Sequence, residues 1–423
     1  MDGPQRAMFD DLAQSSDRKG VFDLITNSAR RQFTRLREVV EAELGGPQNR
    51  ELKTVAFDNV HSASIRTDVR SMNTLLRNES LIKLISRVDF NRRVSIPVKQ
   101  SKATKKKKSS RGNLGFTLAA GYALGAGSND WWLRDTSLDV LHGHSFRGRG
   151  RKIAVVDSGV DAGMSTVRNK ILAFSHFDQQ GGILVDDVNR ITDAGCHGSK
   201  VCDLIAAGAP DAQFIVTRVL DGIPKKEVGT VEQITGGLQW IVDKHVELQR
   251  EGNKDGIDIA NISIDVVNKQ NVIAPMIHIL NALGIQPVVA VGNRGKLYRS
   301  RIADLGMSVG AIDDNGSVWH RSCRRPHIVA PGVGIWCNHP PLRELKYKVA
   351  GSYNGTSFST AITTACLAVL MEAIDCDHHE YANALIDAAR QVSGRNGRHR
   401  RSGWGRLNVM DAYNLLRAKH PSP

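Results

Sequence analysis

From about residue 113 onward, apolar runs of strand length alternate with longer stretches of helical spacing. The expected strands are Lys152–Asp157, Gln213–Val219, Ile257–Ile264, Gln286–Val291 and Met307–Ile312, and the expected helices are His197–Ala207, Val231–Arg250, Val272–Leu283 and Ser357–Ile374. This alternation predicts an α/β fold, in which a mostly parallel sheet is flanked by helices. Functional residues in such folds gather at the C-terminal ends of the strands.

The N-terminal part of the chain has shorter strands around two helices. Residues 1–20 are polar and are expected to be a disordered tail. Residues 21–98 then follow the order βαββαβ, which is typical of a small ferredoxin-like α+β domain. Its expected strands are Val21–Thr26, Lys53–Phe57, His61–Ile65, Leu81–Val88 and Arg93–Val98, with helices over 28–44 and Thr67–Asn78. A basic linker is expected over 99–113, followed by the larger domain over 114–423.

The stretch that begins at Ser357 is apolar or small nearly all round, which predicts a buried helix. Its longest apolar part, Ala361–Met371, is interpreted as too short to cross a bilayer. A serine in the first turn of such a helix lies beside unpaired backbone N–H groups, where developing negative charge is stabilised. The structural alternative is that Thr356 or Ser357 merely caps the helix. A chemical role for Ser357 therefore requires partners elsewhere in the chain.

The composition of the chain is that expected of a large globular protein without a secretory signal or a disulfide framework. The chain has 423 residues and is 41% hydrophobic, which is ample for a large core. Met1–Pro4 opens without a basic segment, so we expect no secretory signal and a cytoplasmic protein. The six cysteines form no CxxC pair and are expected to be free thiols. Cys196 is expected to be a buried, inert thiol rather than an oxidation-sensitive one.

The net charge of +14 is unevenly distributed. Residues 1–112 hold 23 Lys and Arg against 13 Asp and Glu, and a smaller basic cluster runs over 395–406. A nucleic-acid partner would bind the basic N-terminal part. The sequence favours a solvated basic linker instead, because no aromatic interleaving or nucleic-acid motif accompanies the charge. No membrane partner is expected.

Three further motifs follow expected strands or open expected helices. Asp157 ends a buried strand, His197 opens a helix, and Asn293 follows a strand that ends in Gly292. Each has an ordinary structural explanation when taken alone: a turn aspartate, a structural histidine and a Gly-Asn turn. Together with Ser357 they supply every group that acyl transfer needs.

In that interpretation Ser357 is the nucleophile and His197 takes and returns its proton. Asp157 would orient the imidazole ring, and the amide of Asn293 would donate to the oxyanion. The helix N-terminus should disfavour the histidine cation and Asp157 should favour it. The chain order Asp, His, Ser is one of three known for this triad, and GTSFS at 355–359 lacks the last glycine of a G-x-S-x-G elbow. Both features argue against an α/β-hydrolase.

At these motifs the chain resembles the subtilisin-like serine proteases, or subtilases. The segments DSG at 157–159, HGSKV at 197–201, GN at 292–293 and GTSFS at 355–359 are similar to that family's signatures, as is NISI at 261–264. The resemblance covers roughly residues 130–415. It implies a serine endopeptidase that forms an acyl-enzyme intermediate on protein or peptide substrates. Ser263, Ile264, Asp265 and Gly292 are the substrate-binding residues that it implies.

The resemblance also implies that residues 21–98 act as a propeptide, assisting folding and inhibiting the active site from within the chain. Cleavage is then expected in the linker 99–113. Many relatives bind calcium, but no clear calcium loop is visible, because Asp186, Asp187 and Asp193 form only a weak acidic cluster. We therefore expect no cofactor and no metal site, with calcium left open.

The chain departs from the family pattern at a few positions. Asp265 stands where glycine is usual, and it could crowd the substrate strand or favour a basic substrate residue. Ala361 replaces a common proline, and Lys200 and Asp203 stand where His and Gly are frequent. None of these changes removes a catalytic group. Two alternatives stay open: an inactive, subtilase-like binding module, and a nucleic-acid-associated protein that uses its basic N-terminal part.

Overall fold

The computed structural model describes residues 130–421, with the exception of 162, 165, 223–226, 251–255, 266–272, 301, 338–350 and 393–396. In the N-terminal part of the chain it describes residues 36, 38, 40, 53–57, 62–66, 93–95 and 99–100. The expected tail over 1–20 lies outside the described residues, as does most of the expected domain over 21–98 and of the linker over 99–113. These boundaries stay predictions.

An eight-stranded sheet forms the centre of the molecule, in the order β13-β12-β11-β10-β5-β8-β6-β7. Its strands are β5 (Lys152–Asp157), β6 (Ile171–Phe177), β7 (Ile183–Asp186), β8 (Gln213–Arg218), β10 (Ile259–Ile262), β11 (Gln286–Ala290), β12 (Met307–Ile312) and β13 (Ile328–Pro331). All neighbouring pairs are parallel except β6 and β7 at one edge. The predicted α/β fold with a mostly parallel sheet is confirmed.

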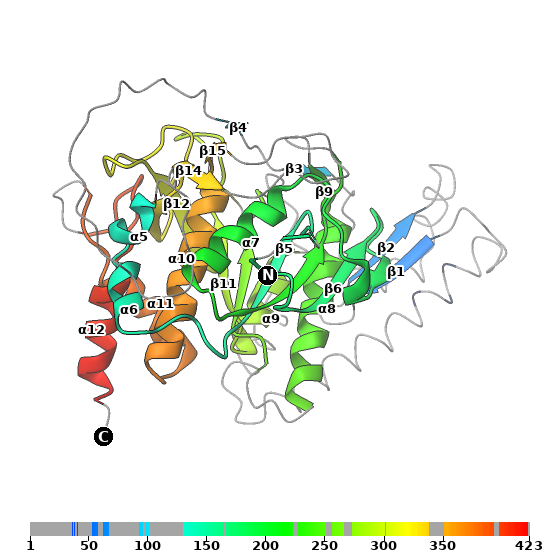
Figure 1. Ribbon diagram of the computed structural model, residues 1–423. Helices are drawn as coiled ribbons and strands as arrows, with labels where there is room; N and C mark the ends of the chain where they lie inside the picture. Colours follow the sequence, from blue (N-terminus) through cyan, green and yellow to red (C-terminus); the bar gives the residue numbers. More distant parts are fainter. Residues whose placement is uncertain are drawn as a thin grey trace.

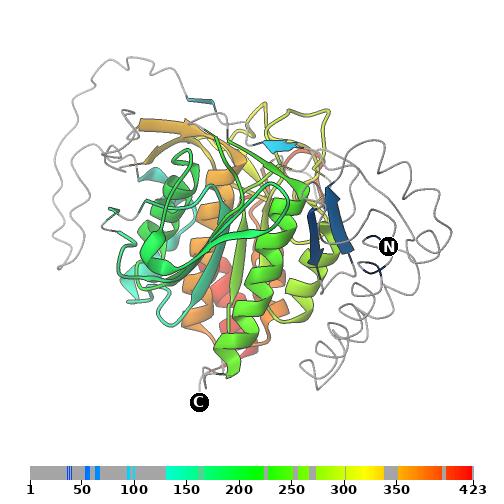
Figure 2. The same ribbon diagram turned by 90° about the vertical axis from the view of Figure 1, so that its right-hand side faces the viewer.

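Helices cover both faces of the sheet (Figures 1 and 2). One layer contains α7 (His197–Gly208) and α10 (Thr356–Ala373), which pack against each other, and the other contains α8 (Val231–Arg250) and α9 (Ile273–Ala282). Between residues 130 and 421 the described part of the chain also contains α5 (Trp131–Asp135), α6 (Leu138–Gly143), α11 (His378–Asp387), α12 (Val409–Lys419) and the short 3-10 helix η2 at Val188–Arg190. Both faces of the sheet are thereby dry, which explains why β5 and β11 are apolar without alternation.

Helix α10 is the central helix of the core (Figure 1). It is 18 residues long with a mean hydropathy of 1.3, so length and composition alone would allow it to cross a membrane. The expected apolar part, Ala361–Met371, lies within this helix, and the expectation that it does not cross a membrane stays a prediction. In the fold, 89% of the helix is buried inside the protein, which accounts for its apolar character.

The topology places the active-site elements together. From β5 the chain goes to β6 and β8 on one side of the sheet and later to β10, β11 and β12 on the other side. The segments that leave β5 and β10 therefore diverge in opposite directions and open a crevice at the carboxyl ends of these two strands. Asp157 ends β5, and Ser263 follows β10 directly.

Smaller ladders involve the N-terminal part of the chain. Strands β1 (Lys53–Phe57) and β2 (Ser62–Arg66) form an antiparallel hairpin, close to the expected strands there. Strand β3 (Arg93–Ser95) pairs with β9 (Val228–Thr230), and β4 (Lys99–Gln100) pairs with β15 (Gly351–Asn354), which also pairs with β14 (Val333–Cys337). The described part of the expected strand over 93–98 thus joins the larger domain instead of the β1–β2 sheet (Figure 1).

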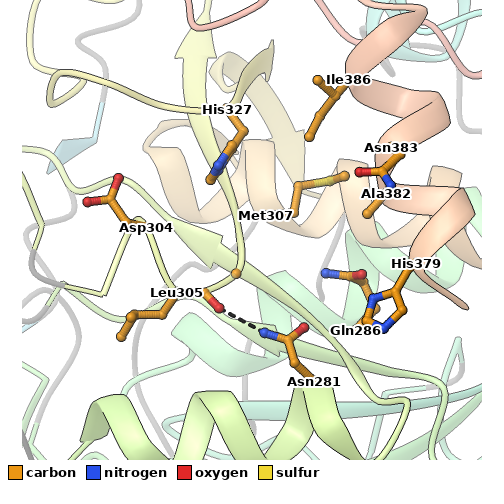
Figure 3. Close-up of a pocket in the computed structure, with 11 residues that line it drawn as sticks. Asn281, Gln286, Asp304, Leu305, Met307, His327, His379, Ala382, Asn383 and Ile386 are labelled. Carbon is orange, nitrogen blue, oxygen red and sulfur yellow. Dashed lines mark hydrogen bonds between the residues drawn. The ribbon is translucent and has the colours of Figure 1, made fainter. Parts of the chain in front are cut away.

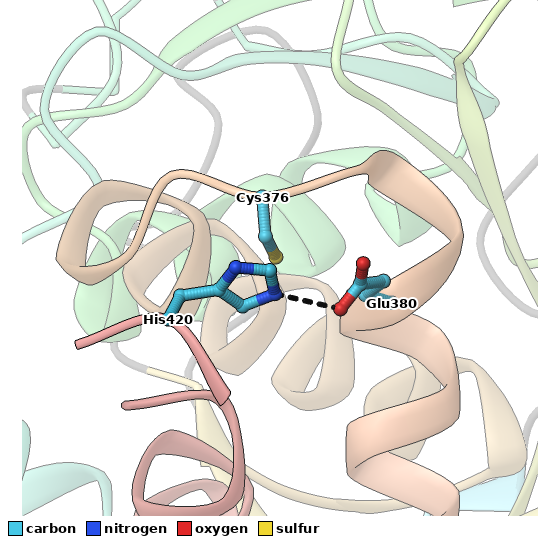
Figure 4. A group of neighbouring side chains, drawn as sticks. All are labelled: Cys376, Glu380 and His420. Carbon is cyan, nitrogen blue, oxygen red and sulfur yellow. Dashed lines mark hydrogen bonds and ion pairs between the residues drawn. The ribbon is translucent and has the colours of Figure 1, made fainter. Parts of the chain in front are cut away.

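Polar contacts connect the end of α12 to the start of α11 (Figure 4). Glu380 accepts from Lys419 Nζ at 2.6 Å and lies 2.8 Å from His420 Nε2. The ligand-type atoms of Cys376, Glu380 and His420 lie within 4.8 Å of one another. Because Lys419 already supplies a positive charge to the carboxylate, this group is explained as a polar clasp between α11 and α12.

Candidate active site

The first two predicted catalytic residues lie side by side in the core. His197 Nδ1 is 2.8 Å from Asp157 Oδ1 and 3.0 Å from Oδ2. Asp157 is fully buried and His197 is 1% exposed, so their interaction is little screened by solvent. A carboxylate acceptor at Nδ1 fixes that nitrogen as the protonated one and leaves Nε2 as the basic nitrogen.

Two glycines explain why the strand end and the helix start approach so closely. Gly159 has φ +106, and a Cβ there would lie 2.0 Å from Thr192 O. A Cβ on Gly198 would lie 2.0 Å from Gly159 O. Both contacts are far shorter than a methyl group allows, so each position requires glycine. The glycines that follow Asp157 and His197 in the two motifs are therefore what lets β5 and α7 bring these side chains together.

The carboxylate of Asp193 accepts hydrogen bonds from residues at the start of α7. Its Oδ1 accepts from the N–H of Gly195 at 3.1 Å, from the N–H of Cys196 at 3.0 Å and from Ser158 Oγ at 2.7 Å. Its Oδ2 accepts from the N–H of Ser199 at 3.0 Å and from Ser199 Oγ at 2.5 Å. The carboxylate thereby satisfies N–H groups that a helix start leaves without partners, and it connects them to the end of β5.

The protonation of His197 reflects competing effects. Burial lowers its pKa, but the charge of Asp157, the hydrogen bond to Asp157 and the charge of Glu227 outweigh burial and raise the pKa above its usual value. Asp157 raises the pKa as expected, but the main opposing effect is burial, and the expected effect of the helix N-terminus stays a prediction. His197 Nε2 is buried and has no hydrogen-bond partner among the described residues, so the basic nitrogen is left available.

Ser357 lies in the first turn of α10, as predicted, and is 2% exposed. Its Oγ donates to Ser263 O at 3.2 Å, while Ser263 Oγ donates to Ser357 O at 3.3 Å. The ring of the next residue, Phe358, lies 6.1 Å from the His197 ring, centroid to centroid. The serine turn and the histidine are thus neighbours, although the hydroxyl is hydrogen-bonded to β10 in this conformation.

Asn293 is held by the residue that precedes Ser357. Its Oδ1 accepts from the N–H and from the hydroxyl of Thr356, both at 2.9 Å. Because a backbone N–H can only donate, this contact fixes the amide with oxygen toward Thr356. The amide nitrogen then lies on the other side, 3.6 Å from where a Cβ on Gly355 would be. The donor end of Asn293 therefore lies near Gly355, two residues before Ser357.

The predicted substrate-binding residues lie close to the catalytic residues and are buried. Ile264 is fully buried, and Asp265 is 5% exposed. Gly292, at φ +98, lies so close to Asp265 that a Cβ there would be 2.9 Å from the carboxylate. Asp265 forms an ion pair with Arg294, whose Nε lies 3.1 Å from Oδ2. The carboxylate that the sequence marked as a possible contact for a basic substrate residue therefore already has a cation.

Two carboxylates that the sequence did not single out lie at the ends of β9. Glu227 is 2% exposed, and its Oε2 has no hydrogen-bond partner among the described residues. Burial raises its pKa, against the opposing charge of His197. Glu232, in the first turn of α8, also has a buried Oε2 without such a partner, and burial raises its pKa to about 7. A glutamate in a polar segment carries no sequence signal, so only the fold reveals these groups.

The acidic cluster considered for calcium does not converge. Asp193 is engaged with α7, Asp187 caps η2 by accepting from the N–H of Asn189, and Asp186 accepts from Trp240 Nε1 at 3.2 Å.

A cavity of about 330 Å³ between β12, α9 and α11 contains none of the predicted catalytic residues (Figure 3). Its lining includes Asn281, His327 and His379.

All six cysteines are free thiols. Cys196 is 1% exposed, and burial together with the charge of Asp193 raises its pKa to about 12. The thiol beside His197 therefore stays protonated near neutral pH, which is the inert state expected for it.

The chain's own N-terminal segment borders this site on two sides. Strand β3 pairs with β9, which follows Glu227, and β4 pairs with β15, which ends three residues before Ser357. Both pairings are antiparallel. Residues 93–95 and 99–100 are therefore both paired with strands of the larger domain, one of which ends close to Ser357 in the sequence.

Comparison with known proteins agrees with this geometry. Residues 148–405 match the model of the subtilase family. Subtilisin Savinase from Lederbergia lenta is 26% identical over 264 residues, which cover 58% of this chain and 86% of that protein. Subtilisin E from Bacillus subtilis (strain 168) is 24% identical over 300 residues, covering 64% and 68%. The alkaline protease from Alkalihalobacillus alcalophilus is 26% identical over 264 residues, and the chain spans only 60% of its length.

Proposed function

The chain belongs to the subtilase family, and we propose that it hydrolyses peptide bonds in proteins or peptides as a serine endopeptidase. The observation that carries this proposal is the buried Asp157–His197 pair beside the first turn of α10, where Ser357 lies. A buried carboxylate, an imidazole with an available Nε2 and a hydroxyl at a helix N-terminus are the parts of a nucleophile–base–orienter system.

The reaction follows from these positions. Ser357 Oγ attacks the carbonyl carbon of the scissile peptide bond, and its proton passes to His197 Nε2. The imidazolium that forms is stabilised by Asp157, whose charge already raises the pKa of the ring. Negative charge on the carbonyl oxygen is met by the Asn293 amide and by backbone N–H groups at the start of α10. His197 returns the proton to the leaving amine, and water then cleaves the acyl-enzyme by the same steps.

Labelling with a serine-reactive phosphonate tests this function. The probe should attach to Ser357 in the wild-type protein, with the modified residue identified by mass spectrometry. Ser357→Ala is the negative control, and Ser359→Ala is a matched control, since Ser359 is a buried serine on the same helix. If a folded, active-site-accessible sample shows no label on Ser357, the chain is the inactive binding module that the sequence left as the alternative.

The N-terminal segment acts, in this proposal, as an intramolecular inhibitor that is removed by self-cleavage. Support comes from β3 and β4, which pair with strands that border the site. An extended peptide that adds a strand to a sheet edge is a common mode of peptide recognition. The two ladders favour cleavage between Ser95 and Lys99, at the N-terminal limit of the linker over 99–113 or just before it.

Intact-mass analysis separates the possibilities. Wild-type protein should yield a new N-terminus between residues 96 and 99, while Ser357→Ala should remain full length. A new N-terminus inside 100–114 would place the cut in the linker, and cleavage of Ser357→Ala would assign it to another protease. A full-length wild-type chain that still labels at Ser357 would refute self-cleavage but not the endopeptidase activity.

Two further proposals concern cofactors and location. Turnover requires no metal, because the side chains already supply nucleophile, base and oxyanion donor; dialysis against a chelator should leave kcat unchanged. The protein works in the cytoplasm, where six free cysteines stay reduced. Fractionation of cells that produce a C-terminally tagged chain tests the location, and a tag found mainly outside the cytoplasm would overturn it. The expectation that the basic N-terminal part is a solvated linker, with nucleic-acid binding only as the disfavoured alternative, stays a prediction.

A further inference from the structure

The edge of β9 combines a paired strand with two glutamates, each of which has a buried Oε2 without a hydrogen-bond partner among the described residues. β9 pairs with β3 through Arg93 opposite Thr230, Val94 opposite Gly229 and Ser95 opposite Val228. Glu227 immediately precedes this ladder and Glu232 follows it by two residues. A peptide that occupies the edge therefore runs from one carboxyl group to the other.

We propose that Glu227 and Glu232 select substrates with cationic side chains, one near the scissile bond and one farther toward the peptide's N-terminus. This inference rests on the proposed endopeptidase function and deepens it by naming the substrate class. Asp265, which the sequence suggested for the same purpose, is excluded because Arg294 already pairs with it at 3.1 Å.

The burial of Glu227 is the first step of the argument. Its side chain packs against Gly195, where an added Cβ would lie 2.2 Å from Oε1, and Gly195 is two residues before His197. The charged groups that influence Glu227 are His197, Lys200 and Asp157, and no ion pair joins it to either cation among the described residues. Lys200 Nζ instead lies 4.4 Å from the centre of the Tyr353 ring. A buried acceptor without a donor is costly, and an incoming cation would supply the donor.

The second step is charge complementarity in the chain's own segment. The antiparallel register places Arg93 opposite Thr230, at the end of β9 next to Glu232. The sequence has a second arginine, Arg92, directly before it. The paired segment therefore has an arginine position, that of Arg93, at the end of β9 that is followed by Glu232. Burial raises the pKa of Glu232 to about 7, and a neighbouring guanidinium would restore the charged form.

The other end of the register differs. Ser95 is opposite Val228, so in a bound peptide that kept this register the next position would face Glu227. In the sequence, the residue after Ser95 is the uncharged Ile96. The chain's own segment thus offers no cation to Glu227. This explains how the segment could bind the edge while remaining a poorer substrate than a peptide with cations at both positions.

Synthetic peptides with the sequence of residues 90–100 test the proposal, with cleavage followed by fluorescence dequenching. In one pair, arginine or citrulline occupies the positions of Arg92 and Arg93; in the other, arginine or citrulline replaces Ile96. Citrulline keeps the shape of arginine and removes its charge. For wild-type enzyme, kcat/KM should be on the order of 10- to 100-fold higher with arginine in each pair, as a charge-assisted hydrogen bond predicts.

Each variant should affect one pair only. Glu232→Gln should abolish the arginine preference at the Arg92–Arg93 positions, and Glu227→Gln should abolish it at the Ile96 position. Glu247→Gln, which removes a carboxylate from the other end of α8, serves as the matched control and should keep both preferences. Active sites are counted by phosphonate labelling of Ser357 in every sample. An absence of label would refute the endopeptidase function, whereas labelled wild-type enzyme with arginine-to-citrulline ratios near one would refute this inference, without any need for a variant to fold.

Discussion

Removal of the Asp193 carboxylate should both loosen the fold and misplace His197. Asp193 accepts the N–H groups of Gly195, Cys196 and Ser199 at 3.0–3.1 Å and also holds the hydroxyls of Ser158 and Ser199. Loss of a helix-capping acceptor costs about 0.5–2 kcal/mol, and each buried donor left without a partner costs about 1–3 kcal/mol. Since water can reach part of this site, we expect Asp193→Ala to lower the free energy of unfolding by about 3 kcal/mol.

That loss would lower Tm by roughly 6–12 °C in a domain of about 150–250 residues, and the fall should lie at the lower end of this range for the larger domain here. Thermal melting should be measured in the Ser357→Ala background, which prevents self-digestion. In the active background kcat should fall on the order of 10²-fold, because a displacement of about 1 Å at a catalytic group has that effect. Asp193→Asn, which keeps one acceptor oxygen, should lose about half as much stability.

Asp187→Ala is the matched control. Asp187 caps η2 at an exposed site by accepting from Asn189, so its loss should cost at most about 1 kcal/mol and leave kcat unchanged. If Asp193→Ala melts at the same temperature as Asp187→Ala and keeps its kcat, the idea that Asp193 holds α7 and His197 in place is wrong.

Three further predictions concern the catalytic groups. Asn293→Ala should lower kcat on the order of 10²- to 10³-fold with little change in KM, the size measured when a subtilisin loses its amide donor, and an unchanged kcat would remove Asn293 from the oxyanion site. Because the pKa of His197 is raised above 6.5 and the neutral ring is the base, kcat/KM should fall with decreasing pH around a midpoint above 6.5; a midpoint below 6 would contradict the dominance of the carboxylates. Gly198→Ala, whose Cβ would lie 2.0 Å from Gly159 O, should lower stability by about 3 kcal/mol or more, whereas Gly143→Ala has open space and should be neutral in the same melting assay.

The sequence identified the parts of the fold whose apolar runs are uninterrupted. Strands β5, β11 and β12 consist of buried residues throughout and were placed within a residue of their observed bounds. Strand β6 was missed because Ser175 and His176 break its apolar run. Ser175 is buried nonetheless, and its hydroxyl donates to Thr217 on β8 at 3.0 Å. A cross-strand hydrogen bond of this kind lets a polar residue occupy the core, and no local pattern announces it.

The candidate site likewise contains residues that the sequence predicts and residues that only the fold reveals. Asp157, His197 and Ser357 were predicted because each ends a strand or opens a helix next to a characteristic glycine or threonine. Glu227 and Glu232 were not predicted, since their significance depends on burial without a partner, which is a property of the folded environment. For Asp265 the sequence correctly flagged an unusual residue, but its counter-charge, Arg294, could be recognised only from the ion pair.

The position of the Ser357 hydroxyl limits how the site can work. Its hydrogen bond to Ser263 O points it toward β10, while His197 Nε2 has no partner among the described residues. Catalytic hydrogen bonds are often unformed before substrate binds, and rotation about a single side-chain bond is enough to redirect a serine hydroxyl. A substrate strand on β10 would compete for the same Ser263 carbonyl region, so binding itself could release the hydroxyl toward His197. Ser263→Ala removes the reciprocal hydroxyl bond to Ser357 O and leaves this carbonyl in place, so it should alter KM more than kcat. A selective loss of kcat would instead mean that Ser263 positions the nucleophile in the transition state.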